Sequence, residues 1–183
     1  MKKLPFFIFC LLVLSPIAFS QSDQWKLVKP ENLKCTFVMP KDYEEKSFEG
    51  VTLYGNGTEH IYQAHHEKLK YKISVTELPD IGLFSYKSGG LLPYYKQYRN
   101  DIRRKYGLKH VEDFSHVYFD YEGFELDYFD DNEYVNEVIF LHDKKLYSLT
   151  VTRPVASKKD HALDEDADLF FDAFRLLPVI QKP

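Results

Sequence analysis

Apolar and polar residues alternate along much of the chain, and this period of two is typical of strands with one buried face. Tyr71, Ile73 and Val75 show the pattern most clearly, because a polar residue stands on either side of each. Aromatic residues are dense, with 15 Phe, 14 Tyr and 1 Trp, and many occupy the apolar positions of these runs, as strands facing a packed layer require. Strands are predicted at residues 34–39, 51–54, 60–66, 70–76, 110–121, 124–128, 134–142 and 146–153.

Short polar segments separate these strands and predict tight turns. Gly55-Asn56-Gly57 is a strong hairpin signal between the second and third predicted strands. Residues 130–133 predict another turn, and residues 143–145 predict a short hairpin connection. Strands that follow one another through tight turns pair antiparallel, so we expect a mainly antiparallel sheet.

Two segments have the periodicity of a helix instead. Between Leu91 and Tyr106, apolar residues recur at steps of three and four, and Gly107 is placed to end the helix. A second helix is predicted from Ala162 to Phe174, and its apolar stripe must be covered by the sheet. Two helices set apart from the run of strands predict an α+β fold, with the sheet flanked by both helices. The stripe of the second helix carries Leu163, Ala167, Phe170, Phe171 and Phe174.

The first twenty residues have the pattern of a secretory signal peptide. Two lysines precede an apolar run from Leu4 to Leu14, and small residues stand near the expected cleavage point after Ser20. The apolar run is shorter than the roughly 20 residues that a transmembrane helix needs. We therefore expect a mature protein that starts at Gln21, is secreted or periplasmic, and has no stable membrane insertion.

The expected mature chain has the length of one domain. Within it, residues 21–32 form a polar lead-in anchored by Trp25, residues 33–178 form a single domain, and residues 179–183 form a tail. Loss of the two signal lysines changes the net charge from −4 to −6. Nucleic-acid-binding domains are basic, so this charge argues against a nucleic acid as partner.

The mature chain has a single cysteine, Cys35, which excludes an intrachain disulfide. Cys35 lies in a predicted strand, and free cysteine is among the most buried residue types. We expect a core position, and the alternative is a reactive thiol.

Three segments resemble PsbP-like domains. Phe37-Val38-Met39-Pro40 followed by Tyr43 resembles their opening, residues 145–152 resemble their late strand, and residues 170–176 resemble their closing helix-to-strand segment, with Ala173 where Ser is commoner. The resemblance covers roughly residues 33–178. It implies an α/β/α sandwich around an antiparallel sheet, in a family composed mostly of accessory or binding proteins. It implies no catalytic residues and no cofactor.

One helix face carries a cluster of cations in this acidic chain. Lys96, Arg99 and Arg103 share that face of the first predicted helix, with further basic residues in its last turn. A solvated face is one interpretation. The other is a docking surface for an acidic protein or an anionic surface polymer.

Motifs for metal binding or catalysis are not found. His65 and His66 are adjacent in a predicted strand and therefore point to opposite faces, so they do not suit one metal. Asp164, Asp166 and Asp168 favour a helix start over a calcium loop. Weak calcium binding at the acidic turn of Asp130, Asp131 and Glu133 stays open. The chain lacks a G-x-S-x-G elbow and a glycine-rich phosphate loop. Paired carboxylates stay open, because their distance is a tertiary property.

The leading hypothesis is therefore a secreted, non-enzymatic binding or accessory module of unknown ligand. The first alternative is a secreted or periplasmic hydrolase that uses carboxylate or histidine residues not identifiable from sequence. The second is a structural component of the cell envelope.

Overall fold

The computed structural model describes residues 24–52, 55–77, 92–105, 111–118, 121–130, 132–157 and 161–177. This part of the chain contains ten strands, two α-helices and one short 3-10 helix. The elements are β1 (Trp25–Val28), β2 (Cys35–Pro40), β3 (Glu44–Thr52), β4 (Gly55–His66), β5 (Leu69–Glu77), α2 (Leu92–Lys105), β6 (Val111–Tyr118), β7 (Tyr121–Asp130), β8 (Glu133–His142), β9 (Lys145–Pro154), η1 (Val155–Ser157), α3 (His161–Asp172) and β10 (Arg175–Leu176).

The strands form two sheets in which every pair is antiparallel. The large sheet has seven strands in the order β3-β4-β5-β9-β8-β7-β6, and the small sheet has the order β1-β2-β10. The predicted α+β fold with a mainly antiparallel sheet and two helices is confirmed.

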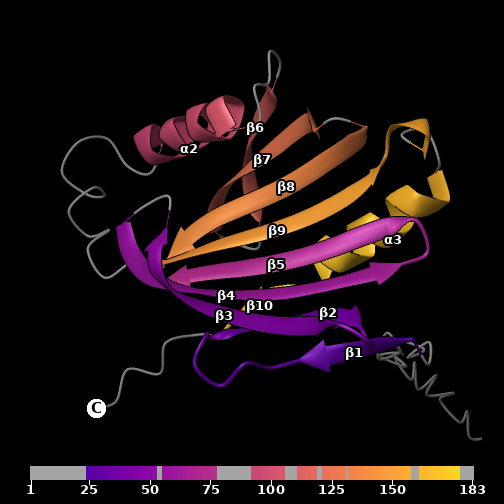
Figure 1. Ribbon diagram of the computed structural model, residues 1–183, viewed down its shortest axis with the longest axis horizontal. Coiled ribbons are helices and arrows are strands. Elements are labelled where there is room, and N and C mark those ends of the chain that lie inside the picture. The colour runs from indigo at the N-terminus through magenta and orange to yellow at the C-terminus, as the bar shows by residue number, and fades with distance from the viewer. Residues whose placement is uncertain are drawn as a thin grey trace, which may run out of the picture.

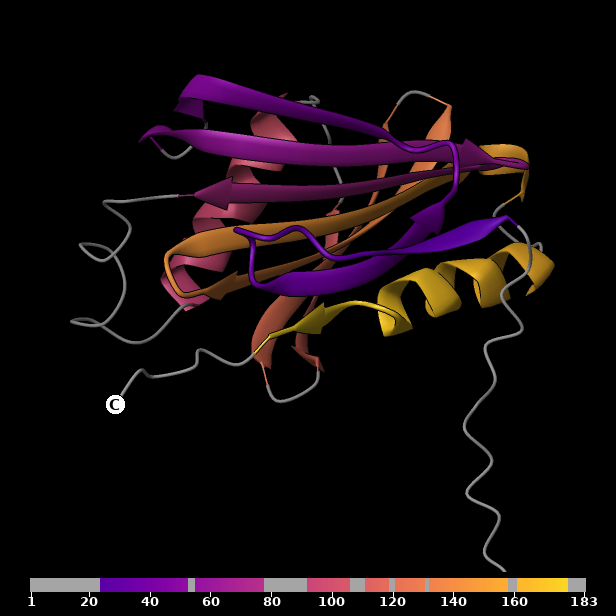
Figure 2. The ribbon, with the colours of Figure 1, turned by 90° about the horizontal axis from the view of Figure 1, so that it is seen from below.

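The two helices lie on opposite sides of the large sheet. Figure 1 shows α2 above the half of the sheet that contains β6 to β8, and Figure 2, seen from below, shows α3 and the small sheet on the other side. We call the side that carries α2 the α2 face, and the side that carries α3 and the small sheet the packed face. The sequence analysis did not anticipate that a second sheet shares the packed face with α3.

Aromatic side chains fill the packed face. Phe170 and Phe174 are 1% and 2% exposed. The Phe174 ring lies 5.5 Å from Phe140 and 5.8 Å from Tyr147, and the Phe170 ring lies 5.1 Å from Tyr71, all between ring centroids. The prediction that the last helix belongs to the core is confirmed. That helix ends at Asp172, so Phe174 packs from just beyond its end.

A separate apolar cluster lies under α2. Tyr95, Tyr98 and Ile102 project from one side of the helix, as their spacing predicts, and are buried against β7, β8 and β9. Tyr95 stacks on Phe124 with 5.2 Å between ring centroids. The predicted helix from Leu91 to Tyr106 is thus confirmed over Leu92–Lys105, and its two end residues lie outside the described residues.

The predicted turn at Gly55-Asn56-Gly57 is wrong. β3 and β4 form a hairpin, but Thr52 pairs with Gly55, so the connection falls at residues 53–54, outside the described residues. The three turn-type residues belong to β4, and β3 extends back to Glu44. A nine-residue ladder outweighs a local turn preference here, because each added pair satisfies backbone groups.

The polar lead-in of residues 21–32 contains a strand that was not predicted. Residues 25–28 form β1, which pairs with β2 in the register Trp25 to Pro40. Trp25 is the anchor, as predicted, since its ring meets Tyr71 edge-on at 5.2 Å. The predicted signal peptide at residues 1–20 and the predicted tail at residues 179–183 lie outside the described residues. None of the described helices has the length and apolar character that a bilayer crossing needs.

Candidate functional site

The α2 face is apolar under the helix and polar beside it. Side chains on this face come from alternate positions of β5, β9 and β8, and the strand register places Lys72, Thr150 and Glu137 side by side across the three strands. The next row contains Ser74 and Ser148. A cavity of about 580 Å³ opens over these rows, and we call it the Glu137 cavity. Its lining residues are Glu59, Ile61, Lys72, Ser74, Thr76, Tyr98, Ile102, Lys105, Tyr128, Asp130, Glu133, Val135, Glu137, Leu146, Ser148, Thr150 and Thr152.

Glu137 is the buried acid of this cavity, with 4% of its surface exposed. Its Oε1 atom accepts hydrogen bonds from the Tyr98 hydroxyl and from Ser148 Oγ, each at 2.5 Å. Its Oε2 atom is buried and has no hydrogen-bond partner within the described part of the chain. Tyr98 comes from α2 and Ser148 from β9, so two elements fix the orientation of the carboxyl group and leave one oxygen unsatisfied.

Burial raises the pKa of Glu137, because a low-dielectric environment disfavours the charged form. The hydrogen bonds from Ser148 and Tyr98 and the positive charges of Lys72 and Lys105 act in the opposite direction. A buried carboxyl with a raised pKa in a cavity is typical of functional sites.

The lining of the Glu137 cavity carries both signs of charge, since Lys72 and Lys105 lie among several acidic residues. Glu59 accepts a hydrogen bond of 2.6 Å from Ser74, and Glu133 forms an ion pair with Lys70. Asp130 also lines the rim. The cavity is therefore polar and acidic at several points without a uniform electrostatic field.

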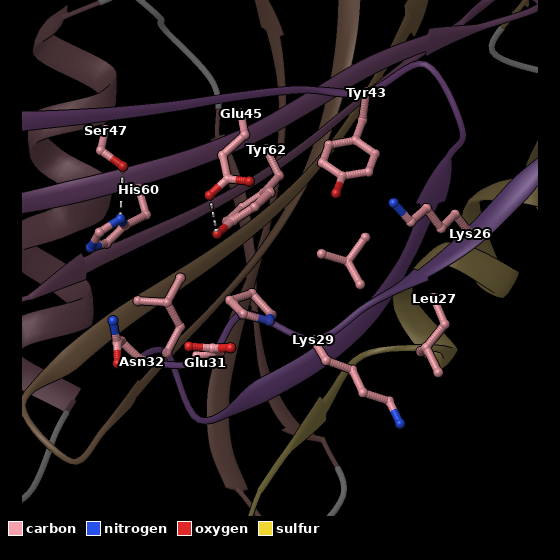
Figure 3. A pocket seen from close by; sticks show the side chains of 13 residues that line it. Lys26, Leu27, Lys29, Glu31, Asn32, Tyr43, Glu45, Ser47, His60 and Tyr62 are labelled. Atoms are coloured by element: carbon pink, nitrogen blue, oxygen red, sulfur yellow. Dashed lines mark hydrogen bonds between the residues drawn. The ribbon is translucent and has the colours of Figure 1, made fainter.

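A second hollow, which we call the edge groove, lies between the β1–β2 connection and the outer strands β3 and β4. It has a volume of about 430 Å³, and Figure 3 shows its lining side chains from Lys26 to Tyr62. The Tyr62 hydroxyl donates to Glu45 at 3.0 Å, and a 2.9 Å hydrogen bond joins Ser47 Oγ to His60 Nδ1. Burial and the neighbouring Glu45 raise the pKa of Tyr62.

The edge groove is the more exposed of the two hollows. Glu45 and Ser47 are exposed side chains of the outermost strand, whereas Glu137 is buried in the middle of the sheet. Water therefore competes for each hydrogen bond in the edge groove, which weakens its electrostatics relative to those of the Glu137 cavity.

The predicted basic face lies on α2. Lys96 and Arg103 are exposed and Arg99 is half-buried, at the spacing that places all three on one side of the helix. None of the three lines either hollow, whereas Lys105 from the same helix lines the Glu137 cavity. The docking role of these residues stays a prediction.

The adjacent histidines at the end of β4 lie in different surroundings. His65 is exposed, and His66 is half-buried with its ring 5.7 Å from Trp25. Within the described ranges, no three His, Cys, Asp or Glu side chains are grouped as metal ligands. Cys35 is fully buried, which confirms the predicted core position, and burial raises the pKa of its thiol to about 12.

Sequence analysis missed Glu137. A signal was present, since one glutamate stands among apolar residues in the predicted strand 134–142. Its partners Tyr98 and Ser148 lie 39 and 11 residues away along the chain. Their convergence on one carboxyl oxygen is a tertiary property.

No family model and no curated protein matches the sequence. Among solved structures, cyanobacterial PsbP (CyanoP) from Synechocystis sp. PCC 6803 aligns with a TM-score of 0.57 over 84% of this chain and 92% of that chain. The fold is PsbP-like. The sequence identity is 7%, so the likeness concerns the PsbP-like fold alone. PA94, a protein of unknown function from Pseudomonas aeruginosa, aligns over 87% of this chain and 99% of that chain with a TM-score of 0.43 and 10% identity.

Proposed function

We propose that this protein is an exported, non-enzymatic binding or accessory module that holds a small polar ligand in the Glu137 cavity. The single observation that carries the proposal is the buried carboxyl group of Glu137, a residue that lines the cavity. Two hydroxyl groups hold one carboxyl oxygen, and the other oxygen is buried without a hydrogen-bond partner among the described residues.

A purely structural role does not account for this carboxyl group. Burying an acceptor without a partner destabilises a protein by about 1–3 kcal/mol, and by more when the group is charged. An apolar residue at position 137 would instead continue the apolar cluster of Val135 and Ile139, its neighbours on the same face of β8. An unfavourable group in a cavity of ligand size is the arrangement expected of a binding site.

A hydrolase is the second candidate, and the Ser47–His60 pair in the edge groove favours it. A histidine can activate a serine hydroxyl when it accepts its proton. In the described part of the chain, however, His60 has no carboxylate hydrogen-bonded to its ring, and Ser47 lies on an exposed strand. Esterase and peptidase assays on the protein and on Ser47→Ala decide this point. Activity that Ser47→Ala abolishes would favour the hydrolase.

Export through a secretory signal peptide is part of the proposal. The signal pattern of residues 1–20 supports export, and intact-mass measurement of the exported protein should show Gln21 at the N-terminus. Retention of Lys2 and Lys3 would contradict export by this route.

We propose an α/β/α sandwich for the layers, because α2 and α3 lie on opposite sides of the large sheet (Figure 1, Figure 2).

Native mass spectrometry of the exported protein tests the binding function. We expect a population heavier than the bare chain, which loses a small molecule on denaturation, and we expect Glu137→Gln to lack it. Glu45→Gln is the matched control, because Glu45 also accepts a tyrosine hydroxyl but lies in the edge groove. A bare chain for the parent protein, together with no stabilisation by any member of a library of charged and neutral metabolites, would favour a structural envelope component instead.

A further inference from the structure

The walls of the Glu137 cavity are unusually rich in hydroxyl groups for the face of a sheet. Ser74, Thr76 and Ser148 are all buried there, and Thr150 and Thr152 extend the series along β9. The register makes Ser74 and Ser148 direct neighbours, so the hydroxyl groups cover adjoining positions on β5 and β9. A hydroxyl group both donates and accepts hydrogen bonds, and such a surface matches a partner that also does both.

The charges of the Glu137 cavity argue against an ionic ligand. A cation that approaches Glu137 meets Lys72 and Lys105, whose charges already act on this carboxyl group. An anion meets the acidic rim of Glu59 and Asp130 and the carboxyl group itself. Like charges in a site of low dielectric constant repel strongly, so each kind of ion is opposed at one side of the cavity.

Apolar surface lines the rest of the cavity. Tyr98, Tyr128 and Ile102 come from α2 and β7, and Val135 and Leu146 belong to the floor of the sheet. A ligand that fits must therefore combine many hydroxyl groups with an apolar face, and a pyranose ring has both. The volume of about 580 Å³ lies within the usual range for small-ligand sites.

We propose that the Glu137 cavity binds a neutral polyhydroxylated ligand of the monosaccharide or short-oligosaccharide class, one hydroxyl group of which donates a hydrogen bond to the Glu137 carboxyl group. The inference rests on the proposed binding function and names its ligand class. Ser148 and Tyr98 hold the carboxyl group in place before the ligand arrives, so little orientational freedom is lost on binding.

Three probes with the same ring and different charges test the ligand class. They are methyl glucoside, which is neutral, glucosamine, which is cationic at neutral pH, and glucuronate, which is anionic. Methyl galactoside and methyl mannoside cover the common stereochemistries. The dissociation constants are measured by NMR titration of the isotope-labelled exported protein, with peak shifts assigned to residues of the Glu137 cavity.

We expect one neutral glycoside to bind roughly tenfold or more tightly than either charged probe, because a charged group loses hydration on entering the cavity and meets a like charge on one side of it. Glu137→Gln should weaken this binding roughly tenfold, because the amide replaces one acceptor oxygen of the carboxyl group by an NH₂ group that cannot accept a hydrogen bond. Glu45→Gln should leave the binding unchanged. Thr150→Val, which removes a hydroxyl group beside Glu137 and keeps the carboxyl group itself, supplies a second variant should Glu137→Gln fold poorly, and it should weaken binding severalfold.

Tighter binding of glucosamine than of any neutral glycoside would overturn the ligand class and assign the cavity to amines. Tighter binding of glucuronate, lost in Lys72→Met, would assign it to anions. In both cases the proposed binding function survives. Failure of every glycoside, with a bound molecule still released in native mass spectrometry, overturns the sugar class alone, whereas failure of both experiments overturns the binding function as well.

Discussion

The two faces of the large sheet bury side chains of different chemistry. On the packed face, Phe170, Phe174 and Tyr147 are buried against one another and their neighbours, and most of their buried surface is apolar. On the α2 face, the apolar cluster is smaller and adjoins a cavity that buries Glu137 beside serine and threonine hydroxyl groups. Burial of apolar surface stabilises the folded state, and burial of an unsatisfied carboxyl group destabilises it. The packed face therefore stabilises the fold, whereas the α2 face retains a group whose burial is unfavourable.

The largest effect should come from removing a ring of the packed face. Phe174→Ala and Phe170→Ala should each lower the free energy of unfolding by about 3–5 kcal/mol, because each leaves a cavity among fully buried aromatic residues. Asp172→Ala is the control, since its side chain is exposed on the same helix and should change stability by less than about 0.5 kcal/mol. Denaturant unfolding measures all three. Parental stability in both Phe variants would mean that α3 is peripheral.

Two buried tyrosines of the packed face differ in the hydrogen bonding of their hydroxyl groups. The buried Tyr147 hydroxyl donates to the Leu33 carbonyl at 3.0 Å, whereas the Tyr71 hydroxyl is buried with no hydrogen-bond partner among the described residues. Tyr147→Phe should therefore lower the free energy of unfolding by about 1 kcal/mol, since it leaves a buried carbonyl unsatisfied. Tyr71→Phe should be neutral or slightly stabilising. Equal losses in thermal unfolding of the two variants would contradict these hydrogen-bond assignments.

The smallest effect on stability is expected at the basic face of α2. Replacing Lys96, Arg99 and Arg103 together with Ser should change the free energy of unfolding by no more than about 1 kcal/mol, because two of the three side chains are exposed. If the face docks an acidic protein or polymer, the triple variant should also reduce retention on a heparin column, a probe for polyanions, at low salt but not at high salt. Unchanged retention at low salt would leave only a solvated face.

Much of the fold could be predicted because its signals are local. The hairpin between β8 and β9 is an example, since a polar turn separates two apolar runs, and both turn residues, Asp143 and Lys144, adopt the positive φ values of such a turn. α2 and α3 could be predicted from periodicity alone. β1 could not, because it is four residues long and only Val28 is buried, so its pairing with β2 depends on contacts distant in sequence.

The candidate site was less accessible to sequence analysis. The alternation of β8 places Glu137 on the same side as Val135 and Ile139, which could have indicated a polar residue in a buried position. No local pattern shows, however, that a tyrosine from α2 and a serine from β9 meet one oxygen of its carboxyl group. The basic residues of α2 were visible in the sequence because charge runs along a helix are local. Sequence analysis therefore favoured the exposed face over the buried acid.

The stability of Glu137→Gln as a function of pH tests most directly whether Glu137 is retained at the expense of stability. Because burial raises the pKa of this carboxyl group above its ordinary value of 4.5, the folded state binds the proton more tightly than the unfolded state. The contribution of Glu137 to stability is therefore greatest below pH 4.5 and is lost as the pH rises through the folded-state pKa. We predict that Glu137→Gln and the parent protein are similarly stable near pH 4. At pH 7 the variant should be more stable by about 1–3 kcal/mol, because the carboxylate of the unfolded parent must either take up a proton or be buried as a charge on folding, whereas the amide does neither. A variant less stable than the parent at pH 7 would show that Glu137 stabilises the fold, and would contradict the account.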